Sequence, residues 1–232
     1  MREREAAGHV RAGLVAICAA AWAAFGALTL LVATHPDGTA LDLWLAPRLV
    51  QSALALPMLA AAGRILDVLG GDVMAMLIVA IVGLLLVVRR HGRLAGFEVA
   101  SALGGVLLCT TVKYLVDRPR PATVGLLLTE STPSYPSGHA TAGITVFVGL
   151  GIVSLLVLTP GWRWAVATPL FVIGPVIGVS RSVVGVHWPT DVLGGWALGA
   201  AWMATVALIA IRAGGSTNRP VSRPTGEPAA AA

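Results

Sequence analysis

Long apolar runs, separated by short polar stretches, make up most of the chain. A helix needs about 20 apolar residues to cross a bilayer core of about 30 Å. Six runs reach or approach this length: 12–34, 73–88, 94–112, 140–162, 164–180 and 192–211. Their lengths predict an all-α bundle of six membrane-spanning helices. Glu98, near the start of its run, is expected at the membrane interface.

The stretch 41–69 has a different pattern, because charged residues are spread among its leucines. Its longest uncharged part, 49–63, is short for a span and contains Pro57. The arginines before 12–34 and after 73–88 belong on the same side of the membrane by the positive-inside rule, so an even number of crossings separates them. We therefore expect 41–69 to be an extra helix that lies in the interface or dips into it.

Composition agrees with a membrane protein, since 56% of the residues are hydrophobic and only 12% are charged. The net charge of +5 lies mainly beside the apolar runs, where membrane topology accounts for it, so we expect no nucleic-acid partner. The same rule places both termini in the cytoplasm. The predicted parts are a cytoplasmic N-terminus (1–11), a six-span domain (12–212) and a disordered cytoplasmic tail (213–232).

Three short stretches concentrate Lys, Arg, His, Asp and Ser side chains in this apolar chain. They are Lys113–Pro121, Tyr135–His139 and Ser180–Asp191. The predicted topology puts all three at span ends on the outer face of the membrane. We therefore expect them to converge on one site.

The residue types in these stretches favour a phosphate ligand. Lys113, Arg120 and Arg181 provide three positive charges, and the guanidinium fork fits phosphate oxygens. Ser137 adds a hydroxyl donor. Gly138 allows close approach of the backbone, and a helix starting there directs free N–H groups to the same place.

Two histidines can supply the chemistry of phosphate transfer. A neutral imidazole can attack phosphorus, and a protonated imidazole can protonate the leaving oxygen. If a helix begins at Pro189, Asp191 lies close to His187 and orients its ring. His139 has no such partner nearby in the sequence, which makes it the candidate general acid.

A metal site is the competing chemistry, because His139, His187 and Asp191 could form a two-histidine, one-carboxylate set. The three cationic side chains expected around them would repel a divalent cation and attract an anion. We therefore expect no metal and no cofactor.

Taken together, the three stretches resemble the motifs of the type 2 phosphatidic acid phosphatase (PAP2) superfamily. The matching residues are Lys113-x6-Arg120-Pro121, Pro136-Ser137-Gly138-His139 and Ser180-Arg181-x5-His187-x3-Asp191. The resemblance implies a helical core like that of PAP2 enzymes and vanadium haloperoxidases. It implies that His187 is the nucleophile that forms a phosphohistidine, that Asp191 is its carboxylate partner and that His139 is the general acid. It also implies metal-free phosphate binding by Lys113, Arg120, Ser137, Gly138 and Arg181.

The implied activity is hydrolysis of a lipid phosphate or diphosphate at the outer face of a bacterial inner membrane. Polyprenyl diphosphates such as undecaprenyl diphosphate rank first, ahead of phosphatidylglycerol phosphate and phosphatidate. The main alternative is a non-catalytic lipid-phosphate-binding or transport protein, and a second is a vanadate-dependent haloperoxidase. The resemblance assigns no role to Asp117 or Arg118 and no oligomeric state.

Overall fold

The computed structural model describes residues 2–122 and 130–216. Every regular element in these two ranges is helical, which confirms the predicted all-α fold. In chain order the elements are α1 (Arg2–Thr34), α2 (Ala40–Ala55), α3 (Pro57–Gly70), α4 (Asp72–Val88), α5 (Gly92–Val116), α6 (Gly138–Ala142), the π-helix η1 (Gly143–Val148), α7 (Gly149–Val157), α8 (Pro160–Val183) and α9 (Pro189–Ser216).

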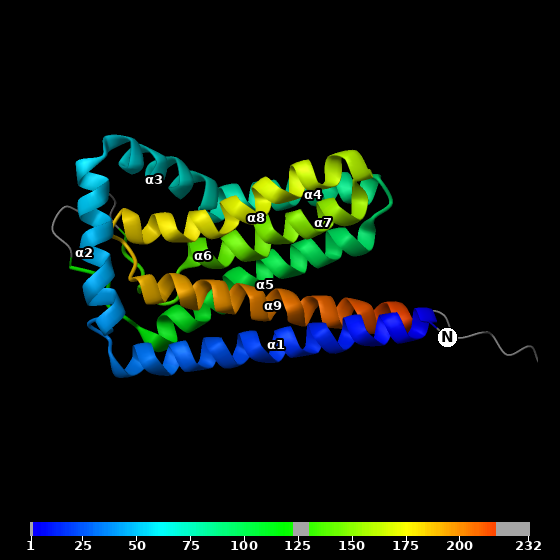
Figure 1. Cartoon of the computed structure of the whole chain (residues 1–232), viewed down its shortest axis with the longest axis horizontal. Coiled ribbons are helices and arrows are strands. Elements are labelled where there is room, and N and C mark those ends of the chain that lie inside the picture. Colours follow the sequence, from blue (N-terminus) through cyan, green and yellow to red (C-terminus); the bar gives the residue numbers. More distant parts are fainter. Residues whose placement is uncertain (1, 123–129, 217–232) are drawn as a thin grey trace, which may run out of the picture.

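The long helices form one bundle and run roughly parallel or antiparallel to one another (Figure 1). Helix α1 lies along α9, and α5 contacts both α4 and α9. Helices α6, η1 and α7 follow one another without a break and pack against α8. Together with α4 and α5, these helices form the main core from small, branched and aromatic side chains: Ala75, Val79, Ala102, Ala142, Val146, Phe147, Leu150 and Ile177.

Two helices, α2 and α3, form where one interfacial helix is expected at 41–69. Thr39 and Asp42 form a capping box at the start of α2. The helix ends at Ala55. Leu56 follows with an extended backbone, the conformation favoured before Pro57, and α3 is bent by 109° relative to α2. Helix α2 crosses one end of the bundle (Figure 1), and Asp42 is buried there instead of facing the membrane surface.

Within the described ranges, five helices are long and apolar enough to cross a membrane: Gly8–Thr34, Gly92–Val116, Gly138–Val157, Pro160–Val183 and Pro189–Ala213. The bent pair α2–α3 would be a sixth if it crossed as one unit. The predicted span 73–88 corresponds to α4, a shorter apolar helix of 17 residues. The helices are those of an integral membrane protein, and the six-span count and the orientation stay predictions.

The boundary between the predicted spans 140–162 and 164–180 is wrong by several residues. The first helix ends at Val157, and Pro160 occupies the first turn of α8. Proline is well suited to that position, because its missing N–H would have no helical acceptor there. Arg163 consequently lies inside α8 and not between two helices.

The two ends of the chain also differ from the predicted boundaries. The segment predicted as the N-terminal region, 1–11, is helical from Arg2 onward. At the other end, α9 continues to Ser216, so the first residues of the predicted tail 213–232 are helical. The remainder of that tail, 217–232, lies outside the described residues.

Glu98 is buried inside the bundle, so its expected interfacial position is wrong. Its exposed fraction is 0%, and a Cβ atom placed on Gly149 would lie 2.7 Å from one of its oxygens. In the part of the chain that the structure describes, neither carboxylate oxygen has a hydrogen-bond partner. The position of a residue along a span does not reveal which face of the helix meets a neighbouring helix.

The three polar stretches lie at the same end of the bundle (Figure 1). Helices α5 and α8 end there, α6 and α9 begin there, and α2 crosses it. The backbone N–H of Ser137 donates to the carbonyl of Asp191 at 3.0 Å, which joins the second stretch directly to the third. The fold therefore gathers segments from residues 113 to 191 around one site.

Candidate active site

The loop between α8 and α9 places His187 in the interior. Helix α8 ends at Val183, and Gly185 follows with a positive φ of 85°, a conformation that favours glycine. His187 is only 2% exposed. Helix α9 then begins at Pro189, as predicted, and this brings Asp191 into its first turn.

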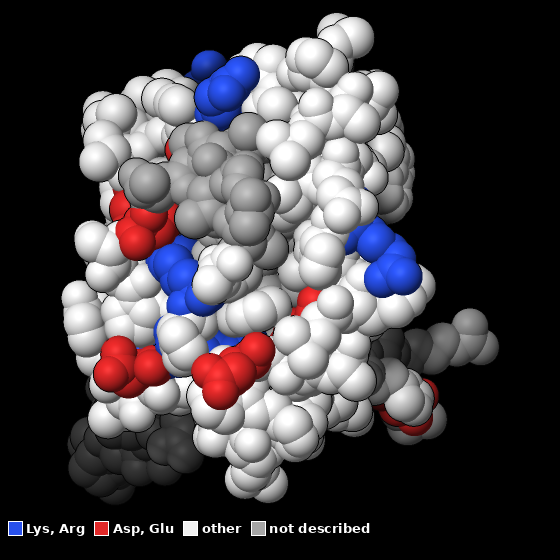
Figure 2. All heavy atoms as spheres, turned by 90° about the vertical axis from the view of Figure 1, so that its left-hand side faces the viewer, with Lys and Arg blue, Asp and Glu red and all other residues white. Residues whose placement is uncertain are grey.

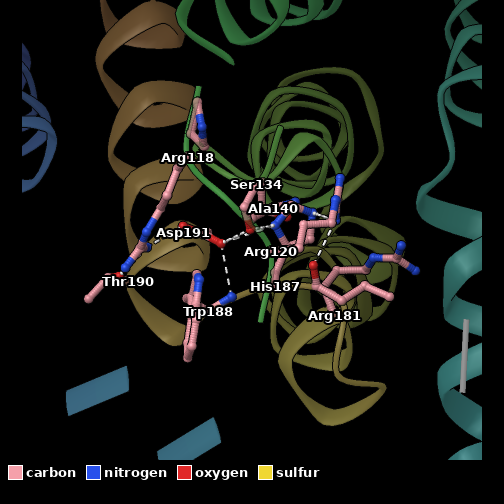
Figure 3. A network of polar contacts seen from close by, with 12 residues as sticks. Arg118, Arg120, Ser134, Ala140, Arg181, His187, Trp188, Thr190 and Asp191 are labelled. Carbon is pink, nitrogen blue, oxygen red and sulfur yellow. Dashed lines mark hydrogen bonds and ion pairs between the residues drawn. The ribbon is translucent and has the colours of Figure 1, made fainter. Parts of the chain in front are cut away.

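His187 lies between a carboxylate and a guanidinium (Figure 3). Its Nδ1 is 3.3 Å from Oδ2 of Asp191, and its Nε2 is 3.2 Å from Nη1 of Arg120. A guanidinium can only donate hydrogen bonds, so Nε2 accepts and the ring hydrogen is on Nδ1, where it faces the carboxylate. This tautomer has its lone pair on Nε2, on the side of the ring where the guanidinium lies.

Hydrogen bonds to both of its carboxylate oxygens fix Asp191. The Ser134 hydroxyl donates to Oδ2, as does the backbone N–H of Trp188 at 2.9 Å (Figure 3). Nη1 of Arg118 lies 2.5 Å from Oδ1. Because Asp191 is completely buried and held from several directions, it orients the imidazole of His187 firmly.

Arg118 links Asp191 to the helix that crosses this end of the bundle. Its Nη2 forms an ion pair with Asp42 of α2 at 2.8 Å, and its Nη1 donates to the hydroxyl of Thr190, also at 2.8 Å. The backbone N–H and the hydroxyl of Thr190 in turn donate to Asp42, at 2.9 and 2.7 Å. Ion pairs and hydrogen bonds therefore connect α2 and α9 through a buried arginine.

Backbone carbonyl groups hold two of the three expected phosphate-binding cations. Nη1 of Arg120 donates to the carbonyl of Val186 at 2.7 Å, and its Nε donates to Thr132 at the same distance. Nζ of Lys113 donates to the carbonyl of Pro133 at 2.6 Å. The loop before α6 thus positions both cations next to the His187 loop.

Two carboxylates pair with the third cation, Arg181. Its Nη1 contacts Asp67 of α3, and its Nη2 lies 2.7 Å from Glu130. Asp67 also contacts His139, whose Nε2 is 3.1 Å from the Asp67 carboxylate. His139 therefore has a carboxylate partner after all, supplied by a segment far from it in the sequence.

The second stretch starts the helix that carries His139. Ser137 is the N-cap of α6, and its hydroxyl accepts a hydrogen bond from Ala140 N at 3.4 Å. Gly138 and Lys113 line a small cavity of about 40 Å³, a volume sufficient for a water molecule. All eight predicted site residues thus lie at one end of the bundle: Lys113, Arg120, Ser137, Gly138, His139, Arg181, His187 and Asp191.

The sequence model of the PAP2 superfamily matches residues 95–213, which is just over half of the chain. The chain belongs to the PAP2 superfamily. The family expected from the three motifs is therefore confirmed, and the matched range contains all of them.

Similar proteins from two organisms agree with this family. An undecaprenyl-diphosphatase of Sulfolobus acidocaldarius is 33% identical over 56% of this chain, and the match spans 61% of the archaeal protein. A decaprenylphosphoryl-5-phosphoribose phosphatase of Mycobacterium tuberculosis is 33% identical over 73% of this chain and 89% of its own length. The phosphatase class expected from the motifs is thus confirmed at the level of the family.

A solved structure shows the same PAP2 fold. It is the crystal structure of a transmembrane PAP2-type phosphatidylglycerolphosphate phosphatase from Bacillus subtilis. The TM-score is 0.70, and the likeness covers 88% of this chain and 98% of that one. The sequence identity is 22%, so this likeness concerns the fold alone.

His187 of this PAP2 protein stays neutral near pH 7. Burial lowers the pKa of His187 well below its usual value of 6.5, and the nearby charges of Arg120 and Lys113 lower it further. A neutral imidazole with its lone pair on Nε2 is the form that can attack phosphorus.

The charges of the PAP2 site suit an anion. Figure 2 shows this end of the bundle, with Lys and Arg atoms recessed between other side chains and Asp and Glu atoms nearby on the surface. Among the described residues, no group of three or more His, Cys, Asp or Glu side chains is arranged to hold a metal ion. Hydrolysis without a metal or cofactor stays a prediction.

The sequence patterns do not identify four charged residues of the site: Asp42, Asp67, Arg118 and Glu130. Asp42 and Asp67 lie in a largely apolar segment, where a charged residue is costly unless it has a partner. That cost is the signal that could have identified them. Arg118 lies in the variable six-residue gap of the first motif, to which the resemblance assigns no role, and Glu130 gives no local signal.

Proposed function

We propose that this protein hydrolyses a lipid phosphate through a phosphohistidine formed on His187. The observation that carries the proposal is the placement of the His187 ring, whose Nδ1 faces Asp191 and whose Nε2 faces Arg120, because this placement favours the tautomer with its lone pair on Nε2. Lys113 and Arg181 lie in the same site, where they can bind the oxygens of the phosphate. The named activities of the PAP2 relatives support this reaction class.

In the first step, the Nε2 lone pair of His187 attacks phosphorus and forms the N–P bond. The electron pair of the breaking P–O bond moves to the leaving oxygen, which takes a proton from His139. The imidazole of His187 becomes positively charged, and Asp191 offsets that charge through Nδ1–H.

In the second step, a water molecule attacks phosphorus and gives a proton to His139, which is now neutral. The N–P bond breaks, and its electron pair returns to Nε2 of His187. Lys113, Arg120 and Arg181 stabilise the negative charge on the equatorial oxygens in both steps. Inorganic phosphate leaves, and the enzyme returns to its starting protonation state.

The proposed substrate is a polyprenyl phosphate or diphosphate, with undecaprenyl diphosphate first. Two relatives that each share 33% identity with this chain are named for polyprenyl-linked substrates. The predicted location is a bacterial inner membrane, with both termini in the cytoplasm and the site on the outer face. A polyprenyl tail could stay in the bilayer while its phosphate enters the polar end of the bundle.

The test is release of inorganic phosphate by the purified full chain in detergent. The substrate panel contains undecaprenyl diphosphate, a polyprenyl monophosphate, phosphatidylglycerol phosphate and phosphatidate. We expect His187→Ala to lower turnover by at least about a thousandfold, because the nucleophile is lost. Wild-type protein quenched during turnover should also carry an alkali-stable, acid-labile phosphoryl group.

The matched control is His9→Ala, because His9 is exposed on α1 and outside the site. It should keep normal turnover. Residual activity above a tenth of wild type in the folded His187→Ala protein would contradict the nucleophile. Binding of these lipids without any phosphate release would instead favour the alternative of a lipid-phosphate-binding or transport protein.

A further inference from the structure

Asp67 of α3 contacts the ring of His139 through two oxygen atoms. Nε2 of His139 is 3.1 Å from Oδ1 of Asp67 and 3.0 Å from its backbone carbonyl oxygen. The backbone carbonyl oxygen is always a hydrogen-bond acceptor, and the carboxylate oxygen is one when the carboxylate is ionised. Nε2 of His139 therefore carries a hydrogen, which it donates toward Asp67.

This arrangement fixes which ring nitrogen of His139 can exchange a proton. With the Nε2 hydrogen engaged by Asp67, only Nδ1 is left to give a proton to the leaving oxygen. Once Nδ1 has lost that proton, the ring is neutral and its Nδ1 lone pair can accept a proton from water. The contact thus suits both steps of the proposed reaction.

We propose that Asp67 is a positioning residue for the general acid, so that the site contains a second histidine–carboxylate pair in addition to His187–Asp191. This inference rests on the proposed function. The role of Asp67 is to hold the Nε2–H tautomer of His139 and to favour the protonated imidazole needed in the first step.

Other charged groups around His139 do not duplicate this role. Arg181 of α8 is positively charged and opposes protonation of the imidazole, and His187 does the same whenever it is protonated. Glu130, from the segment before α6, has a negative charge that also favours the protonated ring, but it pairs with Nη2 of Arg181 and makes no ion pair with His139. Among the ion pairs of the described residues, the only one formed by His139 is with Asp67.

Asp67 also shares Arg181 with Glu130, and this offers a matched control. Both carboxylates contact the same guanidinium, and their side chains are similarly exposed, at 28% and 31%. Only Asp67 reaches the imidazole of His139. Glu130→Gln therefore removes a carboxylate from Arg181 while leaving the histidine contact in place. Asp67→Asn removes the carboxylate from both Arg181 and the His139 ring and leaves only the backbone carbonyl of residue 67 as an acceptor for the ring.

The test compares the two variants with wild type, using a short-chain phosphatidate in detergent micelles and inorganic phosphate as a competitive inhibitor. We expect Asp67→Asn to lower kcat by about tenfold or more, because the neutral asparagine amide no longer stabilises the protonated ring. The basic limb of its kcat–pH profile should move to lower pH. Its inhibition by phosphate should be unchanged or tighter, because Arg181 gains a free donor.

Glu130→Gln should move the basic limb much less than Asp67→Asn does, because Glu130 acts on the His139 ring without contacting it. Asp67→Glu retains a carboxylate, so the basic limb of its kcat–pH profile should lie closer to the wild-type position than that of Asp67→Asn. Size-exclusion chromatography of each variant checks its fold. If Asp67→Asn leaves the limb unchanged and only weakens phosphate inhibition, Asp67 serves Arg181 and the proposal is wrong. Failure of the proposed function would look different, because wild type would then form no phosphohistidine and His187→Ala would stay active.

Discussion

The two histidines of the site lie in opposite surroundings. On the His187 side, Arg118 and both carboxylates that pair with it have side chains that are 0% exposed. On the other side, the side chain of His139 is 16% exposed and that of its partner Asp67 is 28% exposed. His187, the proposed nucleophile, thus lies in an interior of paired charges, while His139, the proposed general acid, stays accessible.

This difference in exposure changes what similar ion pairs contribute. In the interior the effective dielectric constant is low and salt does not screen the charges, so removing one partner leaves a costly unpaired charge. Near the surface, water and salt screen the attraction, and an ion pair contributes about 0–1 kcal/mol. Substitutions on the two sides of the site should therefore affect different properties.

The largest effect is expected from Arg118→Met, which leaves Asp42 and Asp191 buried without their cation. We expect the free energy of unfolding to fall by about 3–5 kcal/mol. Denaturant unfolding in detergent micelles measures this change. The control is Arg48→Met, because Arg48 is exposed and lies over the ring of Trp44, where its loss should cost about 1 kcal/mol or less. Equal losses in the two variants would contradict the contrast between the two sides.

The helical bundle and the polar end could be predicted because both follow from local signals. The lengths of the apolar runs locate the helices, and the motif residues lie at or near the ends of those runs. Pro189 and Ser137 are local signals for a helix start, and α9 and α6 begin at or directly after them. The pairing of His187 with Asp191 follows from their spacing of four residues.

The remaining partners could not be predicted, because they come from distant segments. Arg118 is 76 positions from Asp42, and Arg181 is 114 positions from Asp67. The scattered charges of 41–69 are typical of an interfacial helix. Residue spacing alone, however, does not distinguish a side chain that faces lipid headgroups from one that faces another helix. The bend between α2 and α3 brings one carboxylate to each side of the site, and no local signal gives that geometry.

A smaller effect is expected on the acid limb of the pH profile of kcat/KM, where the activity falls as the pH is lowered. Burial and the nearby charges of Arg120, Lys113 and Arg181 lower the pKa of His187 well below 6.5, so the ring stays neutral at that pH. We expect loss of kcat/KM through His187 protonation only below pH 6.5, by about tenfold per pH unit once the ring is mostly protonated. In the unfolded chain His187 takes up its proton near pH 6.5, so the stability of the fold also decreases as the pH falls below that value.

Arg120→Gln distinguishes His187 from the titration of the substrate phosphate. Arg120 is one of the cations that lower the pKa of His187, so its removal should move the acid limb to higher pH, along with a lower maximal rate. A limb caused by the substrate would stay where it is. If the acid limb of the wild-type kcat/KM–pH profile is centred above pH 6.5, then His187 does not lie in a buried site surrounded by cations.

The smallest effect is expected from Glu130→Gln on the accessible side. Glu130 occupies Nη2 of Arg181, so an incoming phosphate has to displace it, and its negative charge also repels the substrate. Because Glu130 is partly exposed, the competition is screened, and we expect its removal to lower KM by no more than about fivefold. Kinetics at low and high salt measure this, and the advantage of the variant should shrink at high salt because screening weakens the removed repulsion. A higher KM in the variant would mean that Glu130 holds Arg181 in its binding position instead of competing with phosphate for it.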